Sequence, residues 1–246
     1  MNKFEEAAQG AEPVDAQLRQ GKSFVVAVDG PSGSGKSSVS KAVAKRLGLA
    51  FLDTGAMYRG LTWHCLNAGF DLNNAAMVEA AARTIKLEQS MEPESEFVRV
   101  NGVNVTTAIR EPEISASVST VATNLGARAE LVRRQQAIIA EYNHRIVVEG
   151  RDITTVVAPG AEARLILTAS EEARLRRRGL QLGGTQTAEQ LAEQVLARDA
   201  KDSSVVDFQR AADGVYTVDS SELDFVQTVE AVIAVIRQAI NADPPA

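Results

Sequence analysis

Residues 24–37 read Phe24-Val25-Val26-Ala27-Val28-Asp29-Gly30-Pro31-Ser32-Gly33-Ser34-Gly35-Lys36-Ser37. The first half is a continuous apolar run, which is typical of a strand buried on both faces of a parallel sheet. The second half matches G-x-x-x-x-G-K-[ST], a loop whose backbone N–H groups surround phosphate oxygens. Val39, Ala42, Val43 and Leu47 then follow at helical spacing, and Gly48 is expected to end that helix. Strand, phosphate loop and helix together predict a nucleotide-binding α/β domain.

The chemistry of this loop explains its residue types. Glycines let the backbone approach phosphate oxygens, Lys36 reaches the β- and γ-phosphates, and the Ser37 hydroxyl is a ligand for Mg²⁺. A purine nucleoside triphosphate is therefore the expected ligand. The alternative is a glycine-rich connection with an incidental lysine, but the flanking strand and helix disfavour it. The predicted ATP-binding residues are Gly30, Pro31, Ser32, Gly33, Ser34, Gly35, Lys36, Ser37 and Ser38.

Four further short apolar runs predict strands, at 49–53, 145–149, 164–169 and 215–219. Helical patterns separate them. One apolar face before residue 145 is predicted to hold Leu131, Gln135, Ile138 and Tyr142, and the final stripe is Val226, Val229, Ile233, Ile236 and Ile240. Alternating strands and helices predict a parallel sheet covered on both faces. The exception is Phe97–Val105, where Asn101-Gly102 flanked by alternating valines predicts an antiparallel hairpin, and hence an inserted subdomain.

Composition narrows the function classes. The 26 Lys and Arg against 32 Asp and Glu leave a net charge of −6, which argues against DNA or RNA as a partner. The single cysteine, Cys65, and two histidines predict neither a disulfide nor a thiolate or histidine metal site. No apolar run reaches about 18 residues and no secretory signal is evident, so we expect no membrane partner and a cytoplasmic location.

Arginines near two strand ends suggest a second phosphate site. Arg59 leaves the second strand within Asp53-Thr54-Gly55-Ala56-Met57-Tyr58-Arg59, and it suits a bidentate grip on phosphate, although a surface role is the alternative. Gly150-Arg151-Asp152 leaves a third strand and is expected at the same edge of the sheet. The cluster Arg174, Arg176, Arg177 and Arg178 is either a solvated helix face or part of a lid that closes over the triphosphate.

These pieces resemble bacterial cytidylate kinases, which transfer phosphate from ATP to CMP or dCMP. The resemblance runs from about residue 23 to residue 240 and includes the hairpin-bearing insert. The sequence lacks the Asn-Lys-x-Asp motif with which GTPases recognise the base, and this absence argues against a GTPase. The motifs that carry the resemblance are Val28–Ser37, Leu52–Arg59, Gly150-Arg151-Asp152 with Thr155-Val156-Val157, and Arg198-Asp199 with Asp202-Ser203.

The resemblance implies a P-loop three-layer α/β fold with a five-stranded parallel sheet, helices on both faces, an insert that binds the nucleoside monophosphate, and a short lid. It places Arg59 and Arg151 on the acceptor phosphate, and Arg177 or Arg178 in the lid. Catalytic roles are expected for Lys36, Arg151, Arg177 and Arg178, with Mg²⁺ on Ser37. The implied CMP-binding residues are Thr54, Tyr58, Arg59, Arg110, Ser119, Arg128, Arg151, Asp152, Arg198 and Asp202.

Ser119, Arg128 and Asp152 are expected to face cytosine, and Arg198 and Asp202 the sugar. A carboxylate at Asp152 can accept from the exocyclic amine of cytosine and repels the carbonyl that uracil presents there. Asp202 is followed by Ser203-Ser204-Val205-Val206-Asp207-Phe208, where the family usually has an arginine and then Ala-Pro-Leu. Glu149 replaces the family's usual Asp, and Ile153-Thr154 replaces a Met-Gly type pair.

The expected domain organisation is one kinase domain over residues 23–240. Residues 1–22 would form an extension and 241–246 a tail, with the insert at about 71–125 and the lid at about 174–203. A monomer is expected. The open alternatives are a kinase for another small acceptor, such as dTMP or shikimate, and a non-catalytic nucleotide-binding protein.

Overall fold

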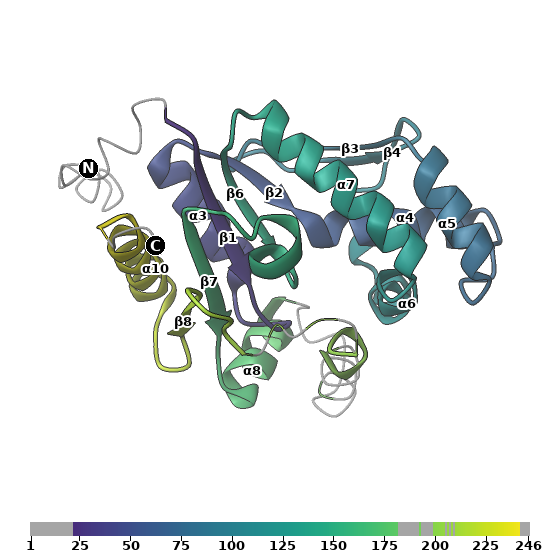
Figure 1. Ribbon diagram of the computed structural model, residues 1–246. Coiled ribbons are helices and arrows are strands. Elements are labelled where there is room, and N and C mark those ends of the chain that lie inside the picture. Colours follow the sequence, from purple (N-terminus) through teal and green to yellow (C-terminus); the bar gives the residue numbers. More distant parts are fainter. Residues whose placement is uncertain are drawn as a thin grey trace.

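A five-stranded parallel sheet forms the centre of the molecule, as predicted (Figure 1). The computed structural model describes residues 22–181, 192, 199–204, 206, 208 and 210–241. Its strands follow the order β2-β6-β1-β7-β8 and pair in parallel throughout. Their bounds are β1 Phe24–Asp29, β2 Ala50–Asp53, β6 Arg145–Gly150, β7 Ala163–Thr168 and β8 Tyr216–Asp219. Because β1 lies between β6 and β7, the loop that follows it leaves from the middle of the sheet.

Helices cover both faces of this sheet, and alternate side chains of β1 serve the two faces. Val25 and Ala27 pack into the cluster under α4 (Thr54–Asn67) and α7 (Leu125–Glu141). Phe24, Val26 and Val28 pack into the cluster under α3 (Lys36–Leu47) and α10 (Phe225–Asn241). This arrangement explains why β1 is apolar from Phe24 to Val28, before it ends at Asp29.

The predicted burial is wrong at one end of each of two helical stripes. Val226 and Tyr142 were placed on buried faces, yet their side chains are 62% and 37% exposed. Val226 lies in the first turn of α10, and the buried positions of this helix begin at Thr228. Tyr142 lies one residue past the end of α7, so its direction no longer follows the helical period.

The insert contains a second sheet of three antiparallel strands, β3 (Leu87–Gln89), β4 (Val98–Val100) and β5 (Val103–Asn104). The predicted hairpin is confirmed: Asn101 and Gly102 adopt φ of 50° and 83°, as a tight turn between β4 and β5 requires. The sheet packs on α4, and Val98 and Val100 belong to the same apolar cluster as Val25. The insert therefore shares its core with one face of the main sheet.

The remaining helical segments belong to the insert or lie at the edge of the sheet where the strands end (Figure 1). They are α5 (Ala75–Thr84), the short η1 (Ala108–Arg110), α6 (Pro112–Ala122), a π-helical turn η2 (Ile153–Val157) and α8 (Glu171–Gln181). The predicted extension, the tail and most of the predicted lid fall outside the described residues, and the domain boundaries stay predictions. Over the part of the chain that the structure describes, no helix has both the length and the apolar character needed to cross a bilayer.

Candidate active site

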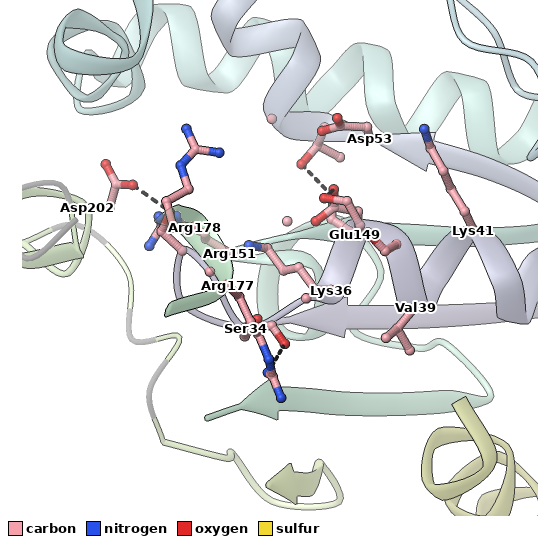
Figure 2. A pocket seen from close by; sticks show the side chains of 18 of the residues that line it. Ser34, Lys36, Val39, Lys41, Asp53, Glu149, Arg151, Arg177, Arg178 and Asp202 are labelled. Carbon is pink, nitrogen blue, oxygen red and sulfur yellow. Dashed lines mark hydrogen bonds and ion pairs between the residues drawn. The ribbon is translucent and has the colours of Figure 1, made fainter. Parts of the chain in front are cut away.

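A cavity of about 790 Å³ lies at the carboxyl ends of β1, β2 and β6 (Figure 2). The phosphate loop, the start of α4, the residues after β6 and the helix α8 all contribute to its wall. Gly30, Pro31 and Ser119 do not line it, whereas most other predicted site residues do. The predicted residues that line it are Ser32, Gly33, Ser34, Gly35, Lys36, Ser37, Ser38, Thr54, Tyr58, Arg59, Arg110, Arg128, Arg151, Asp152, Arg177, Arg178 and Asp202.

The phosphate loop depends on glycine at two positions. Gly30 and Gly33 have φ of 149° and 80°, which L side chains rarely adopt. A Cβ on Gly30 would lie 2.2 Å from the Leu167 carbonyl oxygen, and one on Gly33 would lie 2.8 Å from that of Arg174. Lys36 Nζ donates a hydrogen bond to the Pro31 carbonyl at 3.2 Å, so the lysine folds back across the loop. The loop thus has the concave shape that phosphate binding requires.

Oxygen ligands gather beside the loop. Ser37 Oγ donates to Glu149 Oε1 at 2.6 Å, and Asp53 pairs with Glu149 in the register of β2 and β6. Burial raises the pKa of Glu149, and the neighbouring charge of Asp53 raises it further, while Lys36 opposes this shift. A hydroxyl and two carboxylates, all oxygen donors, fit a Mg²⁺ ion that keeps several waters.

Three arginines converge on the same part of the cavity. Arg59 Nη2 forms an ion pair with Asp53 Oδ2 at 2.9 Å, and Asp53 also caps α4 by accepting from Ala56 N. Burial lowers the pKa of Arg178, and the positive charges of Arg59 and Arg110 lower it further. All three arginines line the same cavity, and Arg110 is also ion-paired with Glu96. This part of the cavity is suited to an anion.

The residues after β6 build a different wall. Arg151 Nη1 contacts Asp199 Oδ1 at 2.8 Å and its Nε contacts Asp202 Oδ2 at 2.9 Å. Ser119 Oγ donates to the other oxygen of Asp202 at 2.7 Å, and Ser119 does not itself line the cavity. Three of the predicted CMP-binding residues are therefore linked to one another.

Asp152 lies against Arg128, whose Nη2 is 2.6 Å from Asp152 Oδ2. Burial raises the pKa of Asp152, and the charge of Arg128 opposes that rise. Tyr58 lies nearby with its hydroxyl buried, and burial raises the pKa of that hydroxyl. Thr54 Oγ1 instead donates to the Glu149 carbonyl at 2.9 Å, which ties the start of α4 to β6.

The two predicted lid arginines lie in different surroundings. Arg177 donates to the carbonyl oxygens of Ser34, Ser220 and Leu223 at 2.6–3.2 Å, so its guanidinium fastens α8 to the phosphate loop. Arg178 lines the cavity with Arg59 and Arg110. Both arginines line the cavity, but the hydrogen bonds of Arg177 go to backbone carbonyls.

Several residues of the site were not predicted. Asp199 was noted only as part of a motif, yet it contacts Arg151, Arg174 Nη1 at 2.5 Å and Ser32 N at 3.2 Å. Asp29 and Phe208 are buried at the edge of the site. A buried-strand run that ends in a carboxylate was the available signal for Asp29. Arg198 and Val205 lie outside the described residues.

Comparisons with known proteins agree with this geometry. The family model described as Cytidylate kinase matches residues 26–238. A cytidylate kinase of Cutibacterium acnes is 43% identical over 214 residues, which cover 87% of this chain and 96% of that protein. A cytidylate kinase of Nocardia farcinica is 44% identical over 224 residues, covering 89% of this chain and 95% of that protein. Among solved structures, a protein of Eubacterium ventriosum aligns with a TM-score of 0.50 and 9% identity over 87% of this chain and 98% of that one, a likeness of fold alone.

Proposed function

Because the chain belongs to the cytidylate kinase family, we propose that its cavity binds ATP and CMP together, with the phosphates meeting between Lys36 and the arginines. The chain transfers the γ-phosphate of ATP to CMP and forms ADP and CDP. We include dCMP as an acceptor in the proposal. The observation that carries the site assignment is the Arg128–Asp152 pair, which lies in the same cavity as the phosphate loop and Arg59.

The donor side of the reaction rests on the phosphate loop. Its N–H groups and the start of α3 surround the β- and γ-phosphates, and Lys36 supplies positive charge to them. Arg177 holds α8 against the carbonyl of Ser34, which keeps this wall of the donor site in place. The phosphate loop and α8 are thereby held in place before the two substrates meet.

The acceptor side holds the phosphate of CMP with Arg59 and Arg151. An oxygen of that phosphate attacks the γ-phosphorus, and the bond to the oxygen bridging the β- and γ-phosphates breaks as ADP leaves. The attacking phosphate is already ionised near neutral pH, so no general base is required. Catalysis consists of alignment and of neutralising charge, to which Lys36, Arg59, Arg151 and Arg178 contribute.

Selection of the base is assigned to Asp152. Its carboxylate accepts a hydrogen bond from the exocyclic amine of cytosine, whereas uracil would place a carbonyl oxygen against it. Arg128 holds the carboxylate in place at 2.6 Å and favours its ionised form. Ser119 and Arg151 hold Asp202, which the proposal places at the sugar.

Ser37, Glu149 and Asp53 are the residues that would hold Mg²⁺, the last two directly or through water. The ion supplies positive charge to the β- and γ-phosphates and orients them. The fit rests on the 2.6 Å contact between Ser37 and Glu149 and on the position of Asp53 beside them. A monomer and a cytoplasmic location stay predictions.

The proposal is tested by incubating the purified chain with ATP, Mg²⁺ and CMP and following phosphorus resonances. We expect CDP and ADP to form in equal amounts. Lys36→Ala should reduce the rate by about a hundredfold or more, because it removes a charge that stabilises the transition state, while circular dichroism stays unchanged. ATP hydrolysis without CDP formation would contradict the proposal.

A further inference from the structure

Phe208 occupies an unusual position for an aromatic residue. Its side chain is fully buried, at 0% exposure, yet within the described part of the chain it belongs to neither of the two apolar clusters that flank the sheet. The centre of its ring lies 4.4 Å from Cζ of Arg151. Phe208 is therefore buried against a charged group of the active site and not within either of those clusters.

The contacts of Arg151 complement one another. Asp199 and Asp202 bind its Nη1 and Nε at 2.8 and 2.9 Å and set the direction of the guanidinium within its plane. Contacts that lie within the plane of the guanidinium restrain the tilt of that plane only weakly. An aromatic ring against the face of the guanidinium supplies that restraint and favours the cation electrostatically. Within the described residues, Nη2 has no hydrogen-bond partner, so one nitrogen is left for a ligand.

In the wall of the cavity that contains Arg151, the positive and negative charges are also balanced. Asp199 is shared between Arg151 and Arg174, whose Nη1 lies 2.5 Å from Asp199 Oδ2. Asp202 is shared between Arg151 and the Ser119 hydroxyl. Arg151 is thus held by fixed groups on three sides, and Phe208 is the only one of the three that carries no charge.

We propose that Phe208 is a positioning residue for Arg151. The ring of Phe208 holds the Arg151 guanidinium at the tilt in which Nη2 binds the acceptor phosphate. The inference rests on the proposed function, because it assumes that Arg151 acts on the phosphate of CMP.

The experiment compares Phe208→Leu with the control Phe24→Leu. Phe24 is a buried phenylalanine at the start of β1, whereas the phosphate loop follows the end of that strand. Both variants remove one buried ring, but only the first removes the ring beside Arg151. Binding of CMP and of cytidine is measured by calorimetry, and KM for ATP is measured by ADP release. Thermal unfolding shows how far each variant is destabilised, and Phe208→Met serves as a second variant if Phe208→Leu does not fold.

We expect Phe208→Leu to weaken CMP binding about five- to thirty-fold, the range of a desolvated cation–π contact. Cytidine binding and KM for ATP should change less than about twofold, because neither involves the grip of Arg151 on the acceptor phosphate. Phe24→Leu should lower thermal stability without changing either affinity. In an Arg151→Lys background, Phe208→Leu should add little further loss, since the planar group it holds is gone.

Equal weakening of CMP and cytidine would overturn the inference, because Phe208 would then only support the fold of the pocket. Unchanged CMP affinity would overturn it as well. Neither result affects the proposed function, which fails only if the unsubstituted chain does not phosphorylate CMP. The two claims are therefore tested separately.

Discussion

The carboxylate of Asp29 accepts two hydrogen bonds from Thr154, one from the backbone nitrogen at 2.8 Å and one from Oγ1 at 2.7 Å. Ile153 N adds a third at 2.8 Å. Asp29 ends β1 just before the phosphate loop, and Thr154 follows the Arg151-Asp152 pair. The contact therefore joins the donor side of the site to its acceptor side. A glycine at the position of Thr154 would supply only the backbone donor.

Thr154→Val should destabilise the protein by about 1.5–3 kcal/mol, because a buried carboxylate loses one hydrogen-bond donor while the side-chain volume is kept. Urea unfolding near pH 8 measures this change. Thr154→Ser retains the hydroxyl and should recover most of the loss. Equal destabilisation by Val and Ser would show that the methyl group, and not the hydroxyl, matters.

The same substitution should have a pH dependence of known sign. Burial raises the pKa of Asp29 above its ordinary value, and the Thr154 hydrogen bonds oppose that rise. The folded state therefore binds the proton more tightly than the unfolded state, and stability falls as pH rises through the folded pKa. Thr154→Val raises the folded pKa further, so its loss should be larger near pH 8 than near pH 5. A loss independent of pH would contradict the role of the carboxylate.

Asp152→Asn should reduce the preference for CMP over UMP by about ten- to a hundredfold, because an amide can donate as well as accept. The ratio of kcat/KM values for the two acceptors measures it. Asp213→Asn, at an exposed position outside the cavity, is the matched control and should leave the ratio unchanged. If the Asp152 variant keeps the ratio of the unsubstituted chain, the base is read by other residues.

Glu149→Gln should raise the Mg²⁺ concentration needed for half-maximal rate by about tenfold, because it removes one of the two carboxylates beside Ser37. The rate is followed at fixed ATP and CMP while Mg²⁺ is varied. Glu88→Gln, an exposed change in the insert sheet, should not alter the requirement. An unchanged Mg²⁺ curve in Glu149→Gln would remove this residue from the proposed ion site.

Arg177 and Arg178 should differ although they are adjacent. Arg178→Ala should lower kcat about a hundredfold with little change in stability, because its charge lies with Arg59 and Arg110 in the cavity. Arg177→Ala should lower the free energy of unfolding by about 2–3 kcal/mol, since it leaves carbonyls of three residues without their donor. Steady-state kinetics and urea unfolding separate the two effects. The reverse assignment of effects would contradict the placement of α8.

Most of the fold could be predicted from local sequence patterns. The apolar run of β1, the glycine loop and the α3 stripe are adjacent in sequence, so each supports the next, and Asn101-Gly102 specifies its own turn. Strand β3 was missed because Leu-Glu-Gln has neither β-branched residues nor clear alternation. Its strand conformation comes from pairing with β4, which a local pattern does not record.

The site was predictable where chemistry lies within a motif and not where it depends on pairing across the fold. Lys36, Arg59 and Asp152 each occur in a recognisable stretch. The contacts of Asp29 with Thr154, Arg151 with Asp202 and Arg151 with Phe208 join residues far apart in the chain. They exist because β6 lies beside β1 and because the segment after α8 returns to the same edge of the sheet. Their identification required the three-dimensional arrangement.

The most direct test of the account is the rate of ADP release from ATP with each of CMP, dCMP, UMP, dTMP, AMP and shikimate as acceptor. The site described here predicts the highest kcat/KM for the cytosine nucleotides, with UMP at least about tenfold lower, because the Asp152 carboxylate repels the uracil carbonyl. Rates with dTMP, AMP and shikimate should be close to the rate without acceptor. A higher kcat/KM for any of these than for CMP, or no stimulation by CMP, would contradict the assignment of this cavity to cytidylate phosphorylation.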